Sequence, residues 1–73
     1  MEKIDFAIAS YRKIKGNPEI EAKASNNLGL IYLSLDQPQK ALLEFERSLR
    51  TNPKLADTHY NLGRLIIDLK GNI

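Results

Sequence analysis

The single histidine of the chain is the first place to look for chemistry. His59 lies close to Asp57 and Tyr60, so a base, an acid and a hydroxyl stand within four positions of one another. If this segment is helical, successive residues are about 100° apart, and the three side chains fan out instead of converging on one substrate atom. We therefore expect a structural role for His59 and no enzyme activity.

The sequence also gives no evidence for a metal site or for thiol chemistry. The chain has no cysteine, and one histidine alone cannot assemble the ligand set of a metal site. We expect no metal and no cofactor. The N-terminus lacks the apolar run of a signal peptide, and no apolar stretch is long enough to span a bilayer. Together with the absence of cysteine, this leads us to expect a cytoplasmic location.

Basic residues are the remaining candidates for a chemical role. Arg12, Lys13, Lys15, Arg47 and Arg50 could contact phosphates, but the formal net charge of the chain is only +2. Acidic residues are interspersed among these cations, which weakens the field that a nucleic-acid backbone requires. We expect no binding to nucleic acid and none to a membrane.

Four amphipathic helices position these side chains. Apolar residues recur at three- and four-residue spacing, as at Ile4, Ala7, Ile8 and Tyr11, and three later segments repeat the pattern. Turn-forming Asn-Pro pairs at 17–18 and 52–53 separate the segments. The pattern predicts an all-α fold with helices over about 2–15, 20–35, 38–50 and 54–70, in a single domain spanning 1–73. Asp36 is expected to cap the third helix, with Gln39 as its reciprocal partner.

Shifting the chain by 34 positions aligns it with itself, which is the mark of a structural repeat. The sequence Asn27-Leu28-Gly29 returns as Asn61-Leu62-Gly63. Ala7 returns as Ala41, and Tyr11 returns as Phe45.

These motifs resemble the tetratricopeptide repeat, which has an aromatic residue, Leu-Gly and Tyr on its helix A, then Ala, Phe and Pro on its helix B. One full repeat runs from about Ala22 to Lys54, with Ser25 in place of the usual Trp. The first helix resembles a lone helix B and the last a lone helix A, so the order is B-A-B-A. The resemblance implies antiparallel helical hairpins stacked as a short α-solenoid. It also implies a core, which we expect to contain Leu28, Gly29, Tyr32, Ala41, Phe45, Leu62, Gly63 and Ile66.

The resemblance further implies a non-catalytic scaffold that binds a protein or peptide in a groove lined by the A helices. Asn27 and Asn61 are the best polar candidates for contacting a peptide backbone. The positions expected to line the groove are Lys23, Asn26, Asn27, Leu30, Leu33 and Ser34 on one helix, and Asp57, Tyr60, Asn61, Arg64 and Ile67 on the other.

A second function stays open beside peptide binding. The B-A-B-A order leaves a helix B without its A at one end and a helix A without its B at the other. Either the chain is a piece of a longer array, or copies associate through these two helices as a swapped dimer or a filament.

Overall fold

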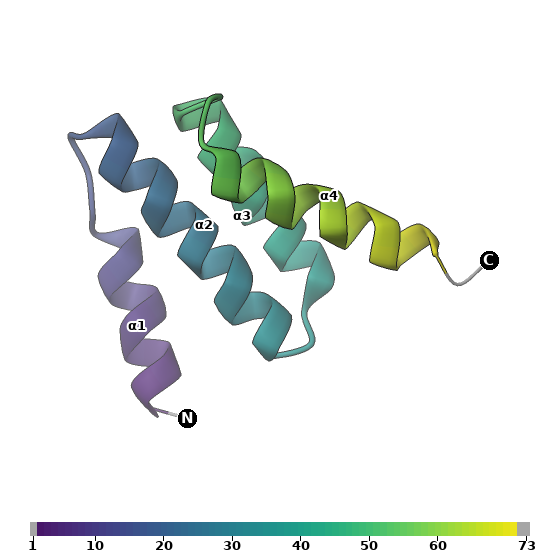
Figure 1. Ribbon diagram of the computed structural model, residues 1–73. Helices are drawn as coiled ribbons and strands as arrows, with labels where there is room; N and C mark the ends of the chain where they lie inside the picture. The colour runs from purple at the N-terminus through teal and green to yellow at the C-terminus, as the bar shows by residue number, and fades with distance from the viewer. Residues whose placement is uncertain (1, 72–73) are drawn as a thin grey trace.

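The computed structural model describes residues 2–71, which form four helices: α1 (Glu2–Arg12), α2 (Pro18–Ser34), α3 (Pro38–Thr51) and α4 (Ala56–Lys70). No strand occurs within that range, so the all-α prediction is confirmed. α2 and α3 form the central antiparallel hairpin, α1 lies along α2, and α4 crosses α3 (Figure 1). Residues 1, 72 and 73 of the expected 1–73 domain lie outside the described part.

Local hydrogen bonds explain where α1 ends and α2 begins. The Asn17 side-chain oxygen accepts from the backbone N–H groups of Glu19 and Ile20, at 3.0 and 3.2 Å, and Pro18 takes the first helical position. α1 stops at Arg12, three residues earlier than the sequence predicts. Its last turn tightens, with Lys13 N–H donating to the Ser10 carbonyl at 3.2 Å, before Gly16 reverses the chain at a φ of 97°.

The turn between α2 and α3 corrects the expected role of Asp36. This residue has a φ of 58° and ends α2, while Gln37 is the N-cap of α3 and makes no side-chain capping bond. The N–H of Asp36 donates to the Leu33 carbonyl at 3.0 Å, and that of Gln37 donates to the Tyr32 carbonyl at 2.9 Å. These two bonds define a Schellman motif, with aspartate in the left-handed position that glycine usually takes.

The centre of the molecule lies between α2 and α3. Phe45 and Ala41 of α3 are fully buried, and Leu28 and Tyr32 of α2 are nearly so. Gly29 makes the contact possible, because a Cβ there would lie only 2.6 Å from Cδ1 of the Phe45 ring. The glycine thus permits the aromatic ring to lie directly on the α2 backbone.

A buried polar cluster joins three of the helices near their ends. The Ser48 hydroxyl of α3 donates to the Ala22 carbonyl of α2 at 2.7 Å, and the Thr58 hydroxyl of α4 lies 2.7 Å from the Ser48 oxygen. Since the Ser48 hydroxyl proton is already donated to the Ala22 carbonyl, Thr58 is the donor in the second bond. Both hydroxyl residues are fully buried. The cluster fixes the start of α4 against the central hairpin.

Part of the expected core is not buried. Gly63 has open space where a Cβ would stand, Ile66 is 39% exposed, and Leu62 is only half-buried. The reason is that α3 covers α2 at Gly29, but among the described residues no helix covers α4 at Gly63 in the same way. Leu65, which was not expected in the core, is buried instead because it faces α3.

Candidate functional site

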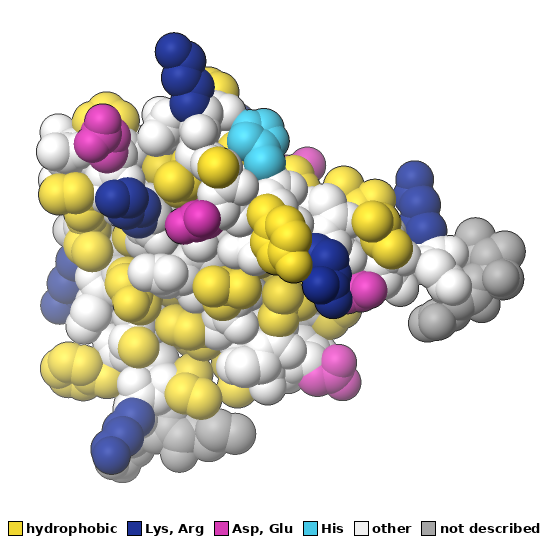
Figure 2. All heavy atoms as spheres, viewed as in Figure 1, with side chains coloured by type: hydrophobic (Ala, Val, Ile, Leu, Met, Phe, Trp, Pro, Cys, Tyr) yellow, Lys and Arg dark blue, Asp and Glu magenta, His cyan; other side chains and the backbone are white. Residues whose placement is uncertain are grey.

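Two stripes of side chains, most of them exposed, run along α2 and α4. On α2 the spacing of three and four residues connects Lys23, Asn26, Leu30 and Leu33, and on α4 it connects Asp57, Tyr60, Arg64 and Ile67. We call these residues, together with Asn61, the α2–α4 face. Tyr60 and Ile67 are each 65% exposed, and Leu30 is 42% exposed. Figure 2 shows hydrophobic side chains gathered over α2 and α4, with charged side chains among them.

An asparagine pair holds the two stripes together. The Asn61 amide nitrogen donates to the Asn26 side-chain oxygen at 3.0 Å. Asn26 is only 6% exposed, so it forms the floor of the face and does not project from it as the sequence predicted. Within residues 2–71 no hydrogen bond uses the Asn26 amide nitrogen or the Asn61 side-chain oxygen. One donor and one acceptor are therefore left at the junction of α2 and α4.

Asn27 points toward α1 and away from the α2–α4 face. Its amide nitrogen donates to the Tyr11 hydroxyl at 3.4 Å, and Arg12 donates to the Tyr32 hydroxyl at 2.7 Å. These two bonds tie α1 to α2. Asn27 and Asn61 were expected to have the same role because the two align, but Asn27 bonds to α1 and Asn61 bonds to α2.

The charged residues of the α2–α4 face are exposed, and the one hydrogen bond described among them, from Arg64, is long. Arg64 donates to the Tyr60 hydroxyl at 3.3 Å, and this bond raises the pKa of the guanidinium. Lys23 and Asp57 are exposed at the N-terminal ends of their stripes. The Ser34 hydroxyl donates to the Ile31 carbonyl at 2.6 Å within its own helix. The face therefore combines apolar area with charges of both signs.

His59 has a structural contact, but not the packed position that its alignment suggested. The ring is exposed, and its Nε2–H donates to the Pro53 carbonyl at 2.6 Å, across the turn that precedes α4. The described residues contain no group of three His, Cys, Asp or Glu side chains placed to hold a metal ion. None of the helices in the same range is long and apolar enough to cross a membrane.

Antiparallel helices stacked side by side, with Gly29 at the close crossing of α2 and α3, are typical of the helical-repeat class of folds. Comparison with family models matches residues 22–55 to the tetratricopeptide repeat. Residues 22–55 therefore have the sequence of a tetratricopeptide repeat, and such repeats are generally protein–protein interaction modules. Searches of curated proteins and of solved structures found no match.

Proposed function

We propose that the chain is a non-catalytic scaffold that binds an extended segment of a partner protein along the α2–α4 face. The exposed apolar area of this face, the charges around it and an asparagine pair support the proposal. Leu30, Tyr60 and Ile67 offer exposed apolar area, and such area clustered on one face is typical of interaction sites. Lys23, Asp57 and Arg64 surround it with charge.

The asparagine pair is the observation that carries the proposal. An extended backbone presents a carbonyl and an N–H side by side, and it needs one donor and one acceptor from its receptor. The Asn26 amide nitrogen and the Asn61 side-chain oxygen supply that combination between the two apolar stripes. Backbone pairing of this kind is independent of the partner's sequence, so the surrounding side chains would determine specificity.

A display library of random linear peptides, panned on the purified chain, tests this function. Selected peptides should bind Ile67→Ser at least about tenfold more weakly than the parent, because the variant removes apolar contact area from the face. Leu43→Ser is the matched control, since Leu43 is 63% exposed on α3, outside the face. Peptides that bind Ile67→Ser normally, or that lose affinity only for Leu43→Ser, would contradict the proposal.

Self-association is the second candidate, and the contrast between two equivalent glycines favours it. Gly29 is covered by Phe45, whereas Gly63, 34 residues later, has nothing within 4 Å of the position of a Cβ. Tyr11 of α1 stands 34 residues before Phe45. We propose that α1 of a second copy can lie on α4 as α3 lies on α2, which places Tyr11 over Gly63. Because this contact is head-to-tail, it produces a ring or a filament.

Sedimentation at several concentrations tests the second candidate. The parent should associate, and Gly63→Glu should remain monomeric because the added side chain occupies the place of the ring. Asp68→Glu, a change on the same helix that adds only a methylene, should associate like the parent. A parent that is monomeric at every concentration would exclude self-association and leave the peptide-binding proposal untouched.

A further inference from the structure

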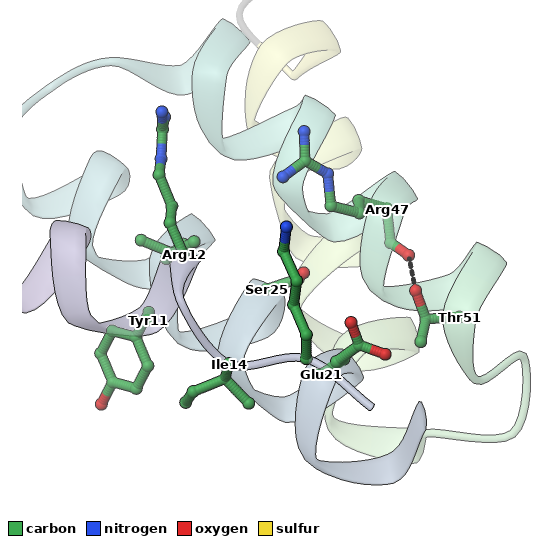
Figure 3. Close-up of a pocket in the computed structure, with 9 residues that line it drawn as sticks. Tyr11, Arg12, Ile14, Glu21, Ser25, Arg47 and Thr51 are labelled. Carbon is green, nitrogen blue, oxygen red and sulfur yellow. Dashed lines mark hydrogen bonds between the residues drawn. The ribbon is translucent and has the colours of Figure 1, made fainter. Parts of the chain in front are cut away.

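A small cavity opens on the side of α2 opposite the α2–α4 face. It holds about 130 Å³ and lies where the end of α1, the first half of α2 and the end of α3 meet (Figure 3). Its lining residues are Tyr11, Arg12, Ile14, Lys15, Glu21, Ser25, Leu28, Arg47 and Thr51. Since Ser25 and Leu28 are on the far side of the helix from Lys23 and Leu30, occupation of this cavity is independent of peptide binding at the α2–α4 face.

The small side chain of Ser25 accounts for the hollow. In the repeat pattern this position carries a Trp, whose indole ring would project into the space that Ser25 leaves open. Ser25 is 7% exposed, and none of the hydrogen bonds among residues 2–71 involves its hydroxyl. The Ser25 oxygen is also not among the fully buried unpartnered atoms of the described residues, so this hydroxyl is accessible from the cavity and available to a ligand.

Hydrogen-bond donors and positive charges from α2, α3 and the end of α1 line the cavity. Figure 3 shows Arg12 and Arg47 on either side of Ser25, with Glu21 below Arg47. Lys15 adds a third cation. The Thr51 hydroxyl donates to the Arg47 carbonyl at 3.0 Å, and Arg12 already donates to the Tyr32 hydroxyl. Lys15, Arg47 and Ser25 are therefore the groups left to bind a ligand.

Two carboxylates oppose the cations and limit what the cavity can hold. Glu21 is part of the lining, and the buried Glu44 lies 3.7 Å from the guanidinium of Arg47, with that oxygen making no hydrogen bond. Against three cations, the two carboxylates leave an excess of one positive charge. The excess favours a compact anion that can receive hydrogen bonds from several directions, and a phosphate has this geometry.

We propose that the cavity beside Ser25 is a binding site for a phosphate group, with Arg47 and Lys15 pairing with its oxygens and the Ser25 hydroxyl donating to a third. The ammonium of Lys15 acts as a point charge, while the Arg47 fork can hold two oxygens at once. The phosphate is either a free ion or a phosphorylated side chain of a partner.

Titration of the folded chain with inorganic phosphate, followed by amide chemical shifts at constant ionic strength, tests the proposal. Saturable shifts are expected at Lys15, Ser25 and Arg47. Arg47→Gln should weaken phosphate binding at least about tenfold, because the charge and the paired donors of the guanidinium are lost. Arg50→Gln is the matched control, because it removes the same charge from the same helix outside the cavity. The phosphate affinity of this variant should stay within about twofold of that of the parent.

Ser25→Trp should abolish the saturable shifts, because the indole fills the cavity, while the helical circular dichroism is retained. Should this variant not fold, Ser25→Ala keeps the cavity open and removes only the hydroxyl, and it should weaken phosphate binding severalfold. A parallel titration with N-acetyl-O-phosphoserine methylamide distinguishes the sources, since a phosphorylated side chain should bind more tightly than the free ion if it is the ligand. Unsaturable shifts in the parent, or equal weakening in Arg47→Gln and Arg50→Gln, would overturn the proposal.

Discussion

Phe45 of α3 packs on the backbone of α2 at Gly29, and this contact sets how closely the two central helices approach. The ring is fully buried, and a Cβ on Gly29 would fall inside its contact distance. The equivalent glycine of α4, Gly63, is exposed and has no neighbour at that point. The same residue type at the same repeat position therefore has two different energetic roles.

Alanine substitution should separate these roles. Gly29→Ala is expected to lower the free energy of unfolding by about 1–3 kcal/mol, because the Cβ overpacks against a buried ring that cannot move into solvent. Gly63→Ala is expected to raise it by about 0.5–1 kcal/mol, since alanine is the better residue in an exposed helix interior. Urea denaturation of both variants measures the difference. Equal effects in the same direction would show that Phe45 does not lie on α2 as described.

The Ser48 hydroxyl supports the junction of three helices, and its removal should be costly. Ser48→Ala leaves the Ala22 carbonyl and the Thr58 hydroxyl without their partner in a buried site, which should lower the free energy of unfolding by about 1–3 kcal/mol. Ser34→Ala is the control, because the exposed Ser34 hydroxyl bonds only to its own helix. Its effect should stay within about 0.5 kcal/mol. If both variants unfold alike in urea, the buried cluster contributes nothing.

Asp36 adopts an unfavourable left-handed backbone conformation at the end of α2. Its φ of 58° is a region that glycine enters freely and other residues enter at a cost of about 1–2 kcal/mol, less for aspartate. Asp36→Gly should therefore stabilise the fold by up to about 1 kcal/mol. Asp68→Gly, within the exposed part of α4, should instead destabilise it by a few tenths of a kcal/mol. Thermal denaturation of the two variants compares them, and a lower melting temperature for Asp36→Gly would contradict the assigned turn.

The sequence predicted the helices and the central contact because both depend on periodic, local patterns. The resemblance to the tetratricopeptide repeat correctly placed Leu28, Gly29, Tyr32, Ala41 and Phe45 in the core. It was wrong for Gly63 and Ile66, because a motif reports residue type and not whether a neighbouring helix is present. The direction of Asn27 and the burial of Asn26 were missed for a related reason, since both depend on how α1 and α4 lie beside α2.

The cap at Asp36 shows a different limit of sequence reasoning. An aspartate followed three positions later by glutamine satisfies the pattern for the start of a helix, yet here aspartate ends the preceding one. Asp tolerates the left-handed conformation, so one residue type serves both kinds of helix end. Only the backbone bonds from Asp36 and Gln37 to α2 distinguish the two.

The effects of replacing Asn26 and Asn61 on the free energy of unfolding should be non-additive, because each amide is the other's hydrogen-bond partner. Asn61→Ala leaves the oxygen of the buried Asn26 unpaired, which should cost about 1–3 kcal/mol of unfolding free energy. The double variant Asn26→Ala/Asn61→Ala removes both polar groups and should cost less than the sum of the single changes by about 0.5–1.5 kcal/mol. Urea denaturation of the four proteins gives this coupling energy. A sum that is additive within error would mean that the two stripes are not joined through these amides, and the backbone-pairing element of the α2–α4 face would lose its support.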